Sequence, residues 1–222
     1  MRRGILFVLS GASGVGKGTV LSYVLSQDDN LYFSVSWTTR SQRKGEVDGK
    51  DYFFKTREEF MFELETTGFL EHAEFVGNMY GTPRRPVEQQ LEAGNDVILD
   101  VERIGALNVK RLMPEAVLVQ LVPPNLSKLR QRLLKRGTDA LEVIGRRLSR
   151  ATEDMQYYHK FDYVIVNDEL STAVDDLESV LRAERLGTSR IVPWEFLVHS
   201  SQDPELEPEL DALEQRIRNS GH

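Results

Sequence analysis

Apolar residues along the chain gather in short runs that alternate with amphipathic segments. The runs at residues 5–9, 96–100, 116–121 and 161–166 are almost continuously apolar, and this pattern predicts buried strands. Apolar positions recur at helical spacing in residues 17 to about 26, 104–112, 126–136, 141 to about 160 and 170–186. Strands that alternate with helices in this way favour the α/β class, with a parallel sheet core flanked by helices on both faces.

The pattern changes in residues 36–82, where short segments of both kinds are mixed. A β-rich run at residues 32–35 leads into a polar, basic segment at residues 36–43, and residues 51–54 form another short run. Thr56 followed by Glu59 predicts a capping box at the start of a helix. Residues 71–75 and 79–81 predict a hairpin around Gly77, and residues 86–93 a helix that ends at Gly94. We therefore expect a mixed α+β insert within the parallel fold.

A glycine-rich segment directly follows the first predicted strand and opens the first predicted helix. Its glycines allow backbone N–H groups to turn toward phosphate oxygens, and Lys17 stands where its ammonium reaches the β and γ phosphates. The hydroxyl expected directly after the lysine comes one residue later, at Thr19, which makes Thr19 the candidate Mg²⁺ ligand. The alternative is a glycine-rich turn with a surface lysine. The candidate nucleotide-binding loop comprises Gly11, Ala12, Ser13, Gly14, Val15, Gly16, Lys17, Gly18 and Thr19.

Polar residues follow several of the predicted strands at their carboxyl ends. Asp100 ends one strand and Asn167 follows another, and in a parallel sheet such positions meet the phosphate loop at one edge. Asp100 can orient water bound to Mg²⁺, or it can cap the helix that follows. We expect a ligand site at this edge of the sheet.

Composition narrows the class of protein and its surroundings. Of the formal net charge of −7, a net −4 lies in residues 187–222, which carry seven acidic and three basic residues. Without a basic excess, a nucleic-acid partner is not expected. The chain has no cysteine and only four scattered histidines, so any metal should arrive with the nucleotide. No apolar stretch has the length of a membrane span or a secretory signal, and we expect a cytoplasmic location with no membrane partner.

Six motifs occur in an order typical of one family. They lie at residues 10–19, 34–40, 45–54, 78–82, 136–138 and 164–168. With these motifs the chain resembles the guanylate kinases over residues 5–186. The resemblance implies a P-loop nucleoside-monophosphate kinase domain at residues 1–186, with a core at residues 1–35 and 96–186, a GMP-binding insert at 36–95 and a small lid at 137–148. Residues 187–222 would be an acidic C-terminal extension, and the oligomeric state is not indicated.

The insert carries candidate ligands for a nucleoside monophosphate. Two arginine forks and two phenols suit a dianionic phosphate, although a solvated strand end and two core tyrosines would look the same. Guanine presents two adjacent donors beside an acceptor, which calls for a carboxylate next to a hydroxyl. The resemblance implies that Glu71 reads the N1 and amino edge and that Glu102 contacts the amino group; a helix N-terminal role is the alternative for Glu102. The implied GMP-binding set is Ser36, Arg40, Arg43, Tyr52, Glu71, Tyr80, Thr82 and Glu102.

Residues 128–150 carry eight basic and two acidic side chains. The resemblance assigns Arg132, Arg136 and Arg147 to closure over the ATP phosphates, with Lys17 and Arg40 completing the catalytic set, and it places Asn167 near the adenine. Lys128, Arg130 and Lys135 fit a solvated helix face. Transfer of a phosphoryl group needs in-line positioning and positive charge rather than an enzyme nucleophile, which this residue set supplies.

Three functions fit these residues. The first is transfer of the γ-phosphate of ATP to GMP, with Mg²⁺, giving ADP and GDP. The second is a non-catalytic guanylate-kinase-like interaction module, although such modules typically lack the phosphate loop that this chain has. The third is a kinase for another phosphorylated acceptor, such as a ribose bisphosphate, and the pairing of Glu71 with Thr82 argues against it.

Overall fold

A computed structural model describes residues 2–66, 68–75, 77–137, 140–188 and 190. Within it, residues 3–182 form one compact unit, and Arg2 and the described residues from 183 onward belong to a second. Helix α7 (Leu170–Arg185) begins in the first unit and ends in the second. The predicted acidic extension lies outside the described residues except for residues 187, 188 and 190, so its boundary stays a prediction.

The first unit is built on a five-stranded sheet in the order β2-β7-β1-β8-β9, with every strand parallel to its neighbours. The strands are β1 (Leu6–Ser10), β2 (Leu31–Phe33), β7 (Asp96–Asp100), β8 (Val117–Val122) and β9 (Tyr163–Val166). The sequence-based prediction of a parallel sheet is therefore confirmed. Leu9 pairs with Asp100, so the phosphate loop and Asp100 leave the sheet at the same edge.

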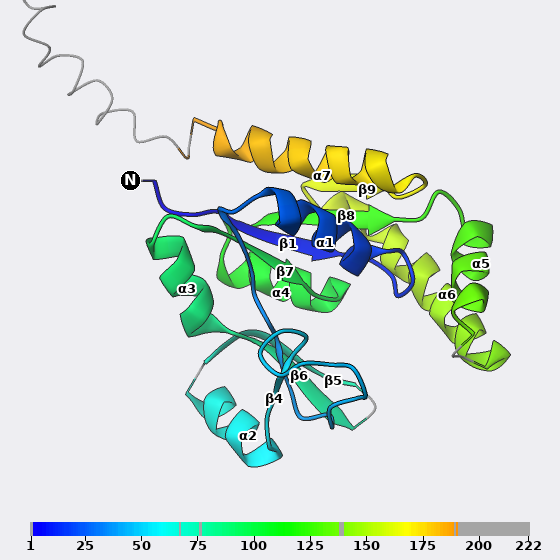
Figure 1. Cartoon of the computed structure of the whole chain (residues 1–222), viewed down its shortest axis with the longest axis horizontal. Coiled ribbons are helices and arrows are strands. Elements are labelled where there is room, and N and C mark those ends of the chain that lie inside the picture. The colour runs from blue at the N-terminus through cyan, green and yellow to red at the C-terminus, as the bar shows by residue number, and fades with distance from the viewer. Residues whose placement is uncertain (1, 67, 76, 138–139, 189, 191–222) are drawn as a thin grey trace, which may run out of the picture. The chain divides into compact units, whose positions relative to one another are not determined.

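Alternating residues of the central strand pack into two different hydrophobic clusters. Phe7 and Leu9 pack with α1 (Lys17–Gln27) and α7 on one face, and Leu6 and Val8 pack with α3 (Arg84–Glu92) and α4 (Arg103–Leu112) on the other. Figure 1 shows these helix pairs on opposite sides of the sheet. Period-two alternation with both faces apolar explains why the strand sequences are nearly continuous in apolar residues.

The insert forms a second sheet in the order β4-β3-β6-β5. Its strands are β3 (Trp37–Thr38), β4 (Phe53–Phe54), β5 (Phe69–Phe75) and β6 (Asn78–Pro83), and β5 pairs antiparallel with β6 as predicted. Helix α2 (Arg57–Glu65) begins at the predicted capping box, in which Thr56 Oγ1 accepts from the Glu59 N–H. A small core of its own, in which the Phe60 and Phe69 rings stack at 4.4 Å, holds α2 against this sheet.

Helices α5 (Leu126–Arg136) and α6 (Leu141–Gln156) pack against each other beside the phosphate loop. Asn125 caps α5 by accepting from the Lys128 N–H at 2.8 Å, and Gly137 ends it with φ +66°. The predicted helix from residue 141 to about 160 is wrong at its end. The Tyr157 N–H donates to the main-chain carbonyl of Asp154, which tightens the last turn of α6. A separate 3-10 turn, Tyr158–Lys160, leads into β9.

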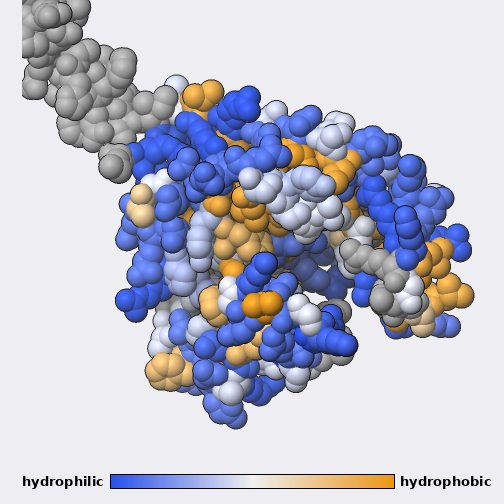
Figure 2. Space-filling model, in the orientation of Figure 1, coloured by the Kyte–Doolittle hydropathy of each residue, from blue (hydrophilic) through white to orange (hydrophobic). Residues whose placement is uncertain are grey.

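Among the helices of the described residues, none combines the length and the apolar composition that a membrane crossing requires. Figure 2 shows a largely hydrophilic surface with apolar patches. Leu134 and Leu141, at the ends of α5 and α6 that are joined by residues 137–140, are among the exposed apolar side chains.

Candidate functional site

The phosphate loop keeps its shape through glycines at positions that a larger residue could not occupy. Gly14 has φ +89° and Gly16 has φ +104°, a region that favours glycine. A Cβ on Gly16 would lie 2.5 Å from Asn167 Nδ2, and one on Gly14 would lie 2.6 Å from a methyl of Leu133. The loop therefore needs glycine both for its backbone and for its close approach to the neighbouring elements.

Lys17 points back across the mouth of this loop. Its ammonium donates to the Gly11 carbonyl at 2.8 Å and lies 3.6 Å from Asp100 Oδ1. Burial raises the pKa of Asp100, and the positive charge of Lys17 opposes that rise. The pair places an ammonium and a carboxylate at the carboxyl end of the sheet, where the sequence predicts both.

Asn167 lies at the same edge but faces the loop backbone. Its side-chain amide is buried and donates to the Val15 carbonyl at 2.8 Å. Because a buried carbonyl left without a donor is costly, this bond fixes the loop to the end of β9. The structure thus shows a support of the loop at Asn167, while its expected proximity to adenine stays a prediction.

Two of the predicted lid arginines also contact this loop. Arg132 donates to the Val15 carbonyl at 3.2 Å and to the Asn167 carbonyl at 2.9 Å. Arg147 on α6 donates to Ser13 Oγ at 2.9 Å. The side chain of the third, Arg136, lies outside the described residues. Positive charge therefore reaches the phosphate loop from both α5 and α6.

In the insert, the guanidinium of Arg40 is held by Glu46, a partner that the sequence-based prediction did not include. Arg40 donates to both oxygens of Glu46, at 2.8 and 3.1 Å, and Glu46 also accepts from the Arg43 main-chain N–H at 2.8 Å. The ion pair raises the pKa of Arg40 and lowers the pKa of Glu46. A two-point carboxylate contact fixes the plane of the guanidinium, which prepares it for an oxyanion. The signal in the sequence was the close spacing of Arg40 and Glu46 around a glycine turn.

Tyr52 and Tyr80 lie beside Arg40, and these residues together with Arg43 are called the basic corner below. The Arg40 guanidinium lies 5.5 Å from the Tyr52 ring, and the Tyr52 and Tyr80 rings meet edge to face at 6.0 Å. Burial raises the pKa of Tyr52, and the negative charge of Asp100 adds to the rise. Tyr52 is therefore within electrostatic reach of the sheet edge that carries Asp100. The Arg43 side chain, in contrast, is exposed to solvent.

A carboxylate and a hydroxyl are buried together on the hairpin of the insert. Glu71 and Thr82 face each other across the β5–β6 pairing, and Thr82 Oγ1 donates to Glu71 Oε1 at 2.8 Å. Burial raises the pKa of Glu71, and the charge of Glu102 contributes, whereas the bonds from Thr82 oppose the shift. Its other oxygen, Oε2, faces α4, because a Cβ on Gly105 would lie 2.8 Å away from it. The structure thus brings together the carboxylate and the hydroxyl that the sequence analysis pairs, and their role toward guanine stays a prediction.

Glu102 and Thr19 occupy more open positions. Glu102 is the N-cap residue of α4 without a side-chain capping bond, and it accepts from Arg150 Nη2 at 2.6 Å. Thr19 is exposed in the first turn of α1, and Ser36 accepts from the Phe53 N–H through its main-chain carbonyl. The described residues contain no group of three His, Cys, Asp or Glu side chains arranged to hold a metal by itself.

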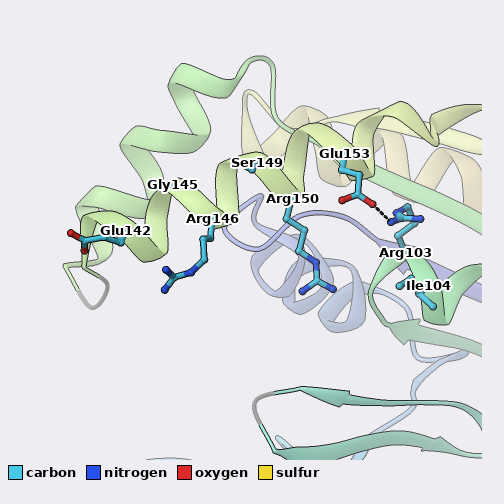
Figure 3. Close-up of a pocket in the computed structure, with 8 residues that line it drawn as sticks. All are labelled: Arg103, Ile104, Glu142, Gly145, Arg146, Ser149, Arg150 and Glu153. Atoms are coloured by element: carbon cyan, nitrogen blue, oxygen red, sulfur yellow. Dashed lines mark hydrogen bonds and ion pairs between the residues drawn. The ribbon is translucent and has the colours of Figure 1, made fainter.

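A cavity of about 720 Å³ lies between α6 and the start of α4. Figure 3 shows Arg146 and Arg150 reaching from α6 into this space, while Arg103 turns to Glu153. The surface is also hollowed between the α5–α6 pair and the insert (Figure 2). The residues that line the cavity are Arg103, Ile104, Glu142, Gly145, Arg146, Ser149, Arg150 and Glu153.

Taken together, the structure gathers the predicted residues into two groups. Lys17, Asp100, Arg132 and Arg147 surround the phosphate loop, and the insert presents a basic corner and a buried carboxylate that face the same sheet edge and α4. A parallel sheet with this loop and this insert defines a P-loop nucleoside-monophosphate kinase fold.

Comparison with known proteins narrows that class. The family model described as "Guanylate kinase" matches residues 3–184. A guanylate kinase of Thermus thermophilus is 50% identical over 222 residues, covering 99% of this chain and 100% of the relative, and one of Acinetobacter baylyi is 51% identical, covering 82% and 88%. The crystal structure of guanylate kinase from Anaplasma phagocytophilum superposes with a TM-score of 0.73 at 34% identity, covering 90% of this chain and 95% of that one.

The chain belongs to the guanylate kinase family. Its activity is accordingly that of a guanylate kinase, the phosphorylation of GMP by ATP, and the interaction-module alternative is not favoured.

Proposed function

We propose that the two groups of residues divide this reaction between them, with ATP at the phosphate loop and GMP at the insert. The observation that carries the proposal is the buried Glu71–Thr82 pair, which lies on the insert against α4, while Lys17 and Asp100 lie at the sheet edge. If the guanine base of GMP binds at Glu71, the phosphate of GMP binds beside Arg40.

At the acceptor side, recognition follows from donor and acceptor geometry. Guanine N1–H and its amino group donate to carboxylates, so Glu71 and Glu102 accept from that edge, while Thr82 and Ser36 contact O6 and the base. Adenine would place an unprotonated ring nitrogen against Glu71 and leave a buried charge unpaired, which costs several kcal/mol of discrimination. The phosphate of GMP is held by Arg40, Arg43, Tyr52 and Tyr80.

At the donor side, residues 11–19 bind the ATP phosphates through backbone N–H groups, and Asn167 lies near the adenine. Lys17, Arg132, Arg136 and Arg147 act as catalytic residues that surround the transferring group with positive charge, and Arg40 does so from the acceptor side. The GMP phosphate oxygen attacks the γ-phosphorus in line as the bond to ADP breaks, so no enzyme nucleophile is needed.

Mg²⁺ accompanies ATP in this proposal. The oxygens of Thr19 and Asp100 are ligands of the kind that Mg²⁺ prefers, and a site that relies on one or two protein oxygens plus substrate phosphates is usual for this ion. Asp100 would hold the ion through a bound water. When bound, the ion neutralises charge on the phosphates.

The arrangement of domains and the location of the enzyme are also part of the proposal. The insert at residues 36–95 and the lid at residues 137–148 close on the core and exclude water from the transfer. The enzyme works in the cytoplasm without a nucleic-acid partner.

A coupled assay for ADP and GDP tests the proposal. Purified protein with ATP and Mg²⁺ should convert GMP to GDP and should use AMP and a ribose bisphosphate poorly, and chelation of Mg²⁺ should stop turnover. In Lys17→Ala, kcat should fall at least about a hundredfold, because the variant lacks an ammonium that binds the transition state more strongly than the bound substrates. A matched variant, Arg130→Ala on the solvated face of α5, should retain the wild-type rate. Equal turnover of AMP and GMP would refute the assignment of Glu71 to the guanine base.

A further inference from the structure

Helix α6 carries two arginines that contact two different substrate sites. Arg147 donates to Ser13 of the phosphate loop at 2.9 Å, and Arg150 donates to Glu102 at the start of α4 at 2.6 Å. Residues three apart on a helix are neighbours on its surface. One stretch of α6 therefore faces the donor site with one arginine and the acceptor site with the next. Figure 3 shows Arg150 extending from α6 on the side that faces the start of α4.

Glu102 lies on the face of α4 that meets the buried carboxylate of the insert. Gly105, three residues further along α4, approaches Glu71 Oε2 so closely that a Cβ there would lie 2.8 Å from it. Glu102 and Gly105 share one face of the helix because of this spacing. The two carboxylates thus border the same space, and Arg150 supplies a positive charge to the more exposed one.

A partly buried brace one turn further along α6 holds this part of the helix beside α4. Arg103 donates to Asp154 at 2.7 Å and to Glu153 at 3.0 Å, and its guanidinium lies 4.0 Å from the Tyr157 ring. The Arg103 side chain is only 13% exposed. Gln120 of β8 also donates to the Asp154 carbonyl at 2.9 Å. This brace joins α4, α6 and the sheet, so that Arg150 and Glu102 are brought together by a rigid framework.

We propose that Arg150 is a positioning residue that orients Glu102 toward the exocyclic amino group of guanine. Unrestrained, the Glu102 side chain would sample many rotamers, since it is 63% exposed. The contact with Arg150 uses Oε2, and a carboxylate has acceptor sites to spare on its other oxygen. Arg150 thereby sets how strongly the enzyme prefers GMP to IMP, the 6-oxopurine nucleotide that lacks the amino group. The inference rests on the proposed placement of GMP.

The test compares steady-state kinetics with GMP and with IMP. In Arg150→Ala, the KM for GMP should rise, so that the ratio of kcat/KM for GMP to kcat/KM for IMP falls about fivefold. This is the size expected for the loss of one partly exposed ionic contact. The KM for ATP and the kcat with IMP should not change. Arg150→Lys should recover part of the ratio, because an ammonium can still contact one carboxylate oxygen. Arg130→Ala, which also removes one positive charge from a helix surface, should leave the ratio unchanged.

A double-mutant cycle identifies the path of the effect. If Arg150 acts through Glu102, adding Arg150→Ala to Glu102→Ala should cause no further fall in the ratio. An unchanged ratio in both Arg150 variants would overturn the proposal, as would an equal loss with GMP and IMP accompanied by a higher KM for ATP, which would instead make Arg150 a ligand of phosphate. An unchanged preference for GMP over AMP in Glu71→Gln would refute the proposed placement of GMP, and this is a separate observation.

Discussion

Replacing Glu71 with glutamine tests the reading of guanine at its most buried point. The substitution keeps the size and shape of the side chain and leaves an oxygen that can accept from Thr82, whose hydroxyl lies 2.8 Å from Glu71 Oε1. It removes the negative charge and turns the other end of the carboxylate, which faces Gly105 of α4, into a donor. Guanine, which presents two donors there, then meets one donor on the protein.

The size of the effect follows from the loss of a hydrogen bond to a charged group. Such a bond contributes about 1.5–3 kcal/mol, which corresponds to roughly a 10-fold to 150-fold lower kcat/KM for GMP. The amide can instead donate to adenine N1 and accept from its amino group, so kcat/KM for AMP should rise. Turnover of both nucleotides, measured by the coupled assay, gives the ratio directly. Glu74→Gln, an exposed exchange on the same strand, is the matched control and should leave the ratio unchanged.

The same variant should change stability in a direction set by the pKa of Glu71. Because burial raises this pKa, the folded protein favours the protonated carboxyl, and the free energy of unfolding falls as the pH rises from the ordinary value of 4.5 through the raised pKa. Glutamine carries no such cost, so Glu71→Gln should be more stable than wild type near pH 7.5 and should lose the advantage at acid pH. Urea denaturation at several pH values measures this. Lower stability at neutral pH together with unchanged nucleotide preference would refute the reasoning.

Two further substitutions test the supports of the acceptor site. Gly105→Ala should raise the KM for GMP without lowering the melting temperature by much, since alanine favours the helix by about 1 kcal/mol while its Cβ displaces the Glu71 carboxylate; an unchanged KM would contradict this. Glu46→Gln should raise the KM for GMP several-fold and leave the KM for ATP unchanged, because Arg40 loses its two-point contact. Calorimetric titration of the free enzyme with GMP checks this, and an affinity equal to that of the wild type would contradict it.

Much of the fold could be predicted because its signals are local. The capping box of Thr56 and Glu59, the strand that ends in Asp100 and the glycines of the phosphate loop each depend on residues a few positions apart. The end of α6 was predicted wrongly, since polar and aromatic residues at 156–160 are compatible both with a helix and with the 3-10 turn that leads into β9. Helix ends depend on where the chain must go next, and that is decided by tertiary structure.

The candidate site divides in a similar way. Local residue order is enough to tell which chemical groups stand at the strand ends and that a hairpin begins at Glu71, whereas the predicted second strand, residues 79–81, stops one residue short of Thr82. The pairing of Glu71 with Thr82 comes from the register of the folded hairpin. The pairing of charged side chains, in contrast, depends on how the helices and strands pack. Arg150 reaches Glu102, Arg103 reaches Asp154, and Asn167 supports Val15 across 152 positions of the chain. With 28 basic and 35 acidic residues in the sequence, many pairings are possible, and packing of α4 against α6 and of β9 beside the phosphate loop selects among them.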